Sequence, residues 1–137
     1  MLFTLNKPIK SICYNIIDLL IKSNNNIKQK SLLLIRLDAI GDYVLFRNFI
    51  QILKNSEKYK DYSITLVGNP IWKNLSEEID ISFIDRFIWL ERDSFSKNFF
   101  YRYKKLKEIT SQGYEIIISP TFSRALFFED TIVKLVS

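Results

Sequence analysis

A nearly unbroken apolar run, Ser31 to Leu37 (SLLLIRL), constrains the fold of this 137-residue chain more than any other segment. A continuous apolar strand is typical of a parallel sheet with both faces covered, because a strand with one wet face alternates polar and apolar residues. The polar turn Asp38 to Asp42 follows, and Asp42 to Lys54 has the spacing of an amphipathic helix. We therefore predict a buried strand, a turn and a helix.

The alternation of strands and helices continues along the chain. Strands joined by helices indicate right-handed βαβ units and hence a parallel sheet. The predicted fold class is α/β, with a Rossmann-like parallel sheet flanked by helices over residues 31–137. Further strands are expected at 63–67, 87–90 and 115–119, and further helices at 71–78, 96–111 and 124–136. The residues expected to be buried in the helix of residues 42–54 are Val44, Leu45, Phe49, Ile52 and Leu53.

Residues 1–30 are expected to form a separate amphipathic helix, Pro8 to Lys22, and a polar linker. An apolar face with nearby lysines is typical of a helix at a membrane interface, but a helix that packs on this domain or docks on another one has the same pattern. No apolar run is long enough to span a bilayer, and polar residues interrupt the N-terminal stretch, unlike a signal peptide. We expect a cytoplasmic protein, with residues 8–22 as a candidate for peripheral contact with the inner face of the membrane. Its apolar positions are Ile9, Ile12, Ile16, Leu19 and Leu20.

The composition excludes several kinds of catalytic site, metal site and cross-link. The sequence contains no histidine, which excludes Ser-His-Asp and Cys-His catalysis and histidine metal sites. The single cysteine, Cys13, cannot form an internal disulfide. The net charge of +5 fits a nucleic acid, a phosphorylated ligand or an anionic membrane surface equally well.

The turn Asp38 to Asp42 is the first candidate site, because ligands of open α/β sheets bind at the carboxyl ends of the strands. Gly41 allows a sharp turn and a close approach of a ligand to the backbone. Asp42 begins the next helix, where its carboxylate is either a helix cap or a general base. A helix N-terminus stabilises the charged carboxylate, so such a base works best when the proton leaves late. One glycine, with no following Lys-Ser/Thr, does not match the dinucleotide or Walker fingerprints.

A second loop, residues 119–124, is expected at the same edge of the sheet. Ser123 and Arg124 have the chemistry to hold a phosphate or a sugar there, since arginine makes bidentate phosphate contacts. The alternative is an ordinary helix start with Ser123 as its cap. The loop after the second strand contains Trp72, which we interpret as a packed aromatic in a turn.

Two further partners are not expected. The basic helix of residues 96–111 carries Lys97, Arg102, Lys104, Lys105 and Lys107, but its aromatic residues have core spacing, so we interpret the charges as a solvated face and predict no nucleic acid. No Asp-x-Asp motif occurs, and residues 77–80 read as a helix end, so we predict no metal.

The segment LLLIRLDAIGDYVLFRNFIQILK resembles the opening of the heptosyltransferase-like glycosyltransferases, family nine of that enzyme class. These enzymes begin with an apolar strand that ends in Arg or Lys, a turn with Gly-Asp, and a helix. The likeness extends from Ser31 to the C-terminus, where ITLVGNPIWKNL, FIDRFIWLERD and GYEIIISPTFSRALFF are compatible with the next three strand regions.

The resemblance implies the N-terminal half of a GT-B fold, in which two Rossmann-like domains face a cleft. The N-terminal domain binds the acceptor, often a lipopolysaccharide core precursor or related cell-envelope glycolipid. The C-terminal domain binds the nucleotide sugar, a co-substrate, and inverting transfer of a heptose or other sugar needs no metal and no further cofactor. The resemblance makes Asp42 the catalytic base and Arg124 a contact to acceptor phosphate. We further expect Gly41, Asp38 and Ser123 to be substrate-binding residues, with Arg36 or Arg47 assisting at anionic acceptor groups.

Two departures from the family pattern lead to an alternative. Asp38 stands where the family often has a small residue, and we expect the donor-binding domain to be missing. We therefore expect a truncated acceptor domain that is inactive alone. The alternative is a non-catalytic α/β binding or interaction domain, although the acidic cluster of a response regulator is not found.

Overall fold

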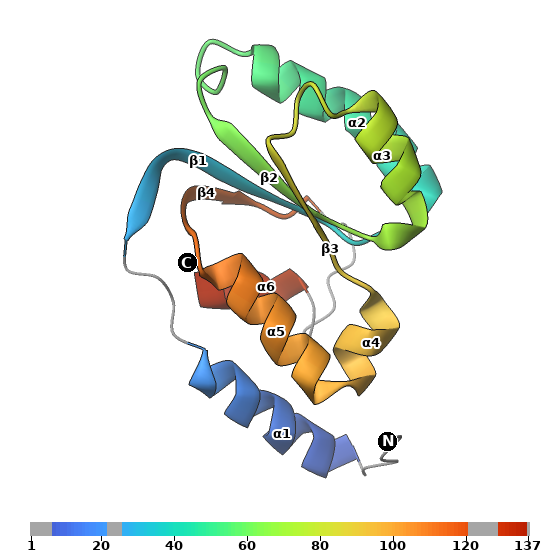
Figure 1. Ribbon diagram of the computed structural model, residues 1–137, viewed down its shortest axis with the longest axis vertical. Coiled ribbons are helices and arrows are strands. Elements are labelled where there is room, and N and C mark those ends of the chain that lie inside the picture. Colours follow the sequence, from blue (N-terminus) through green and yellow to red (C-terminus); the bar gives the residue numbers. More distant parts are fainter. Residues whose placement is uncertain (1–6, 22–25, 121–128, 137) are drawn as a thin grey trace.

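The computed structural model describes residues 7–21, 26–120 and 129–136. In these residues the chain forms one four-stranded, all-parallel sheet with the order β3-β2-β1-β4 (Figure 1). The predicted α/β class, a Rossmann-like parallel sheet flanked by helices, is confirmed. The strands are β1 (Ile27–Arg36), β2 (Ser63–Gly68), β3 (Arg86–Trp89) and β4 (Gly113–Ile118).

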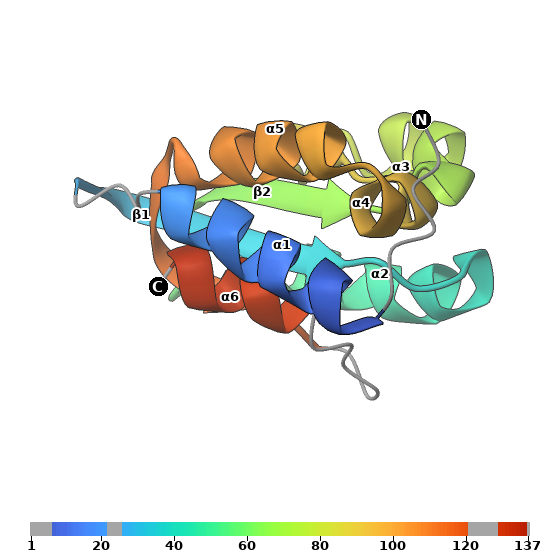
Figure 2. The same ribbon diagram turned by 90° about the horizontal axis from the view of Figure 1, so that it is seen from below.

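The helices lie in layers on both sides of the sheet (Figures 1 and 2). Helices α2 and α3 cover one face, and α4, α5 and α6 cover the other, as right-handed crossovers require when the chain first moves out to β3 and then returns to β4. Helix α1 packs outside the layer that contains α5 and α6. The helices are α1 (Lys7–Leu20), α2 (Ile40–Asn55), the 3-10 turn η1 (Pro70–Trp72), α3 (Lys73–Ile79), α4 (Arg92–Lys97), α5 (Phe99–Thr110) and α6 (Glu129–Val136).

The central strand β1 is apolar throughout its second half because both of its faces are buried. Leu33 and Ile35 pack in the cluster that includes residues of α4, α5 and α6. Leu32 and Leu34 belong to the opposite cluster, with the buried residues of α2. Alternate residues of β1 thus contribute to the apolar cores on the two sides of the sheet, as the continuous apolar run predicted.

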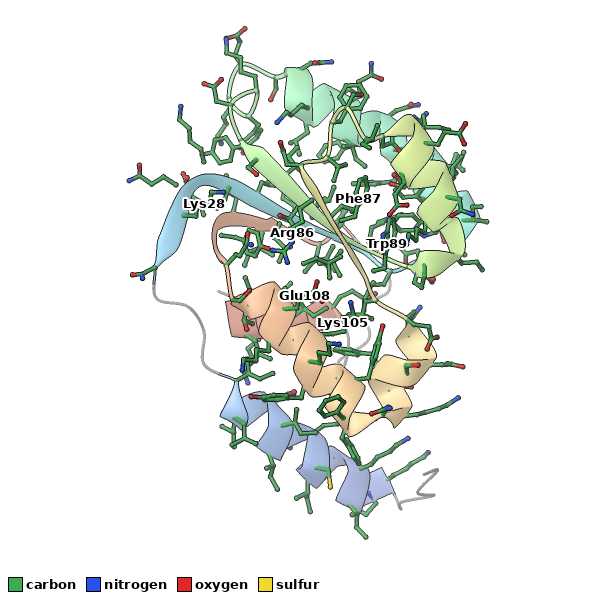
Figure 3. The ribbon with its side chains drawn as sticks, in the orientation of Figure 1. Lys28, Arg86, Phe87, Trp89, Lys105 and Glu108 are labelled. Carbon is green, nitrogen blue, oxygen red and sulfur yellow. The ribbon has the colours of Figure 1, made fainter. Side chains whose placement is uncertain are left out.

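Edge strand β3 shows the same alternation (Figure 3). Arg86 points toward α5, where its Nη2 lies 3.7 Å from Oε1 of Glu108. Phe87 and Trp89 point to the other face and stack with a ring separation of 5.4 Å. The Trp89 indole donates to Glu77 of α3 at 2.9 Å, so β3 is held to a helix on each side of the sheet.

Several predicted boundaries differ from the structure; α2, for example, begins at Ile40 and not at Asp42. Strand β1 begins at Ile27, four residues before the predicted start, and its exposed first residues pair with the start of β4. The single helix predicted at 96–111 is two helices, because Asn98 is extended and its side chain accepts from the Tyr101 amide at 3.0 Å. Asn98 therefore ends α4 and caps α5.

The buried face predicted for α2 is wrong. Only Leu53 of the five expected residues is buried, and Tyr43 and Ile50 join it, whereas Leu45 is 83% exposed. The reason is Tyr43, whose ring stacks on Trp72 at 3.8 Å and turns the helix toward η1 and α3. The other expected residues, all partly or largely exposed, are Val44, Phe49 and Ile52.

Helix α1 also has its apolar residues on the outside. All five of the apolar positions predicted from its helical spacing are exposed, and Tyr14 is its buried residue. No helix in the described ranges has the length and apolar character needed to cross a membrane.

Candidate functional site

Arg36, the last residue of β1, connects three parts of the carboxyl edge of the sheet. Its Nη1 donates to the Pro120 carbonyl, directly after β4, at 2.8 Å. Its Nε lies 3.1 Å from Oδ2 of Asp38 in a largely buried ion pair, and its guanidinium lies 4.7 Å from the ring centre of Phe46 on α2. Arg36 therefore fixes the start of the turn that leads to α2.

The turn is also bonded to the loop after β2. The Trp72 indole donates to the Asp38 carbonyl at 3.0 Å, and the Asn69 amide donates to the Leu37 carbonyl at 3.3 Å. Trp72 is buried, so the interpretation of this residue as a packed aromatic in a turn is confirmed. Its hydrogen bond to the candidate site could not be seen in the sequence.

Asp42 lies in the first turn of α2 with an exposed side chain. The helix cap is Ala39, which makes no side-chain cap bond, so the interpretation of Asp42 as the cap is wrong. Within the described ranges, no hydrogen bond or ion pair of the Asp42 carboxylate is observed. Its backbone carbonyl accepts from Nη2 of Arg36 at 3.4 Å, which places the residue without occupying its side chain. The carboxylate is thus open to a ligand.

Gly41 also lies within α2, and its backbone does not have a positive φ. The turn therefore does not need the conformational freedom for which the glycine was singled out. A Cβ atom at this position would meet nothing within 4 Å. Gly41 and Asp42 form an open surface, and the absence of a side chain at Gly41 leaves the backbone accessible.

A second polar network, which the sequence did not reveal, lies between α2 and α3. Nη2 of Arg47 donates to Oδ1 of Asp80 at 2.8 Å, and the Tyr43 hydroxyl donates to Oδ2 at 2.6 Å. Ser76 Oγ lies 2.6 Å from the same hydroxyl. Burial, and then the hydrogen bond to Asp80, raise the pKa of Tyr43 well above its ordinary value. Arg47 is engaged here, although the sequence suggested a role at anionic groups.

The structure brings three predicted site residues together, Asp38, Gly41 and Asp42, with Arg36 beside them. The spacing of two residues between Arg36 and Asp38 could have indicated this ion pair in the sequence, because residues i and i+2 of an extended chain point to the same side. Ser123 and Arg124 fall outside the described residues. The interpretation of the basic residues of helix 96–111 as a solvated face is wrong for Arg102, which is fully buried.

Two open hollows of about 480 Å³ lie away from this edge. One is between α1 and α6 and is lined by Asn15, Leu19 and Lys134, among others. The other, lined by Lys30, Tyr62 and Glu115, is at the amino-terminal edge of the sheet. Neither hollow is at the candidate site, where Gly41 and Asp42 are exposed.

Among residues 7–21, 26–120 and 129–136, no group of three or more Cys, Asp or Glu side chains is arranged to hold a metal ion. No model of a known protein family matches the sequence, and no curated protein or solved structure matches it significantly.

Proposed function

We propose that this domain is the acceptor-binding half of an inverting glycosyltransferase similar to family nine. The observation that carries the proposal is the exposed Asp42 carboxylate, which does not cap the helix, in the first turn of α2 at the carboxyl edge of a parallel sheet. The resemblance of the segment around this turn supplies the reaction class. The proposed acceptor is a cell-envelope glycolipid, such as a lipopolysaccharide precursor, at the cytoplasmic face of the membrane.

Asp42 acts as the general base in this proposal. The acceptor hydroxyl oxygen forms a bond to the anomeric carbon of the donor while the bond from that carbon to the nucleotide breaks. The hydroxyl proton passes to Asp42, and the leaving nucleotide takes the electron pair. The first turn of α2 stabilises the carboxylate, so proton transfer is expected late, after bond formation has made the hydroxyl more acidic.

The other residues of the turn position Asp42 and leave room for the acceptor. Arg36 holds Asp38 and the carbonyl of Asp42, while the open side of Gly41 allows the acceptor to approach the backbone. Ser123 and Arg124 are proposed to contact an acceptor phosphate. A nucleotide sugar would bind a second domain of the GT-B kind, facing this edge.

The test is the Asp42→Asn variant, made in the longest natural product of the gene. The assay supplies a mixture of nucleotide sugars and glycolipid acceptor and detects product by mass spectrometry. We expect kcat to fall by about a hundredfold or more, as is usual for loss of a general base. Acceptor binding should change little. The matched control is Glu78→Gln, an exposed acid on α3, which should retain full activity.

Full transfer by Asp42→Asn would contradict the assignment of the base. The non-catalytic alternative is favoured by a different observation, the exposed aliphatic side chains of α1 and α2, which suit a docking domain. It predicts that the wild-type protein binds a partner through these helices and transfers no sugar from any donor.

A further inference from the structure

Helix α1 is attached to the rest of the protein through its polar side. Nη2 of Arg102 on α5 lies 3.1 Å from Oδ2 of Asp18, and the guanidinium lies 4.6 Å from the centre of the Tyr14 ring. Tyr14 also meets Phe99 edge-on at 5.3 Å. The contacts that hold α1 in place are therefore an ion pair and aromatic packing.

The opposite side of α1 is a continuous aliphatic stripe. Its residues recur three and four apart, so they share one face of the helix. Leu19 is 82% exposed and Leu20 is 65% exposed. The outer stripe consists of Ile9, Ile12, Ile16, Leu19 and Leu20.

This orientation is the reverse of that of an ordinary surface helix, which turns its apolar stripe to the core. Helix α1 is the outermost element on its side of the sheet, with α5 and α6 between it and the strands (Figures 1 and 2). A contiguous exposed apolar patch of this kind marks a contact with another molecule or with a lipid surface.

The distribution of charge indicates which kind of contact the stripe makes. Helices α1, α4, α5 and α6, on the side of the stripe, carry nine basic and five acidic side chains, a net charge of +4. Helices α2 and α3, on the other side of the sheet, carry three of each. The positive charge of these helices thus lies on the side that presents the stripe, and Arg102 neutralises Asp18, the acid of α1. Anionic lipid headgroups complement this side.

We propose that α1 lies in the plane of an anionic phospholipid surface, with its outer stripe in the boundary between headgroups and acyl chains. The stripe runs along the length of α1, so contact through this side places the helix in the plane of the surface. Lys7 and Lys10 lie in the first turn of α1, on the side of Tyr14 and not in the stripe, so their long side chains are expected to extend along the surface to reach phosphate groups. This inference does not depend on sugar transfer.

The experiment is flotation of the full chain with lipid vesicles. Vesicles of phosphatidylcholine alone are compared with vesicles that contain about 30% phosphatidylglycerol, at low and high salt. We expect binding to the anionic vesicles that weakens as salt rises. In the α1 variant Ile16→Asn/Leu19→Asn, the partition coefficient should fall by about tenfold or more.

The matched control is Leu45→Asn/Ile52→Asn on α2. Leu45 is as exposed as Leu19, and Ile52 is likewise exposed, but both lie on the side of the sheet whose helices carry no net charge. This control should bind vesicles within about twofold of the wild type, and circular dichroism should show that both variants are folded. The variant Lys7→Gln/Lys10→Gln should bind anionic vesicles about tenfold to 25-fold more weakly, since each of the two lysines near such a surface contributes up to about fivefold.

Three results would overturn the proposal. The first is no binding to anionic vesicles by the wild-type chain. The second is an equal loss of binding in the α1 variant and the α2 control. The third is a dimer in sedimentation velocity that becomes a monomer in the α1 variant, without vesicle binding, because the stripe would then belong to a contact between two copies.

Discussion

Nη2 of Arg102 lies 3.1 Å from Oδ2 of Asp18, and this ion pair joins α5 to α1. The Arg102 side chain has no exposed surface, and it also lies over the ring of Phe95 at 4.5 Å. A buried guanidinium needs a negative partner, and the ion pair of Arg102 is with a carboxylate on α1. The ion pair therefore determines which side of α1 faces the protein, and consequently which side faces outward.

Removal of this carboxylate should loosen α1. We expect Asp18→Ala to lower the free energy of unfolding by about 2 kcal/mol, because it leaves a buried cation without its charged partner while the aromatic contacts remain. Hydrogen exchange of the α1 amides should accelerate most. The control is Asp93→Ala, which removes an exposed pair with Lys97 and should cost less than about 0.5 kcal/mol. Equal losses in the two variants would contradict the role given to Arg102.

A second prediction concerns the hydroxyl of Tyr43. Tyr43→Phe removes the bond to the buried Asp80 carboxylate and should lower the free energy of unfolding by about 1–2 kcal/mol at neutral pH. The control is Tyr103→Phe, on the partly exposed side of α5, which should be close to neutral. Urea denaturation measures both.

The hydrogen bond between Tyr43 and Asp80 also predicts how the stability of the protein depends on pH. Because the pKa of Tyr43 is raised, the folded chain holds the phenolic proton more tightly than the unfolded chain does. The contribution is complete below about pH 10 and is lost as pH rises further. The difference in stability between the wild type and Tyr43→Phe should therefore shrink above pH 10. A difference that stays constant up to pH 11 would show that the phenol is not stabilised in its neutral form.

The strands were predictable because their signal is local. Residues 32–35 are apolar at successive positions, and the sheet buries all four, alternately on its two faces. The order of the strands, β3-β2-β1-β4, was not predicted from the sequence.

The faces of the helices were not predictable in the same way. Apolar residues occur almost all around α2, so helical spacing alone fits more than one buried face. Tyr43 and Arg47 decide between these faces by meeting Asp80, which lies more than thirty residues later in the chain. Arg102 and Asp18 do the same for α1. Buried polar pairs between distant segments leave no periodic pattern in a sequence.

The candidate site was predicted in position but not in detail. Gly41 and Asp42 follow the first strand as predicted, since a strand end and a helix start are both visible locally, but they lie within the first turn of α2 and not in the turn before it. The contacts of Arg36 with Pro120, and of Trp72 with Asp38, depend on strand order and were not visible.

Substitution of two aspartates should distinguish a functional carboxylate from a structural one. Asp42→Asn should change the free energy of unfolding by less than about 1 kcal/mol, because only the favourable interaction with the start of α2 is lost. Asp80→Asn should cost about 3 kcal/mol, since Arg47 and Tyr43 lose the charge of a buried carboxylate. Thermal unfolding of the two variants distinguishes them. A large loss in Asp42→Asn would restore a structural role to that residue.

Alanine substitutions at two glycines should have opposite effects on the free energy of unfolding. A Cβ atom at Gly68 would lie 2.7 Å from a ring carbon of Trp89 and closer still to Trp72, so Gly68→Ala forces a rigid ring pair apart and should cost about 2 kcal/mol or more. Gly41 has open space and a helical position, so Gly41→Ala should stabilise the protein by about 0.5–1 kcal/mol. If an acceptor approaches this backbone, Gly41→Ala will weaken acceptor binding even though the fold is more stable. Isothermal titration calorimetry beside denaturation measures the two effects separately, and unchanged acceptor affinity in Gly41→Ala would remove Gly41 from the site.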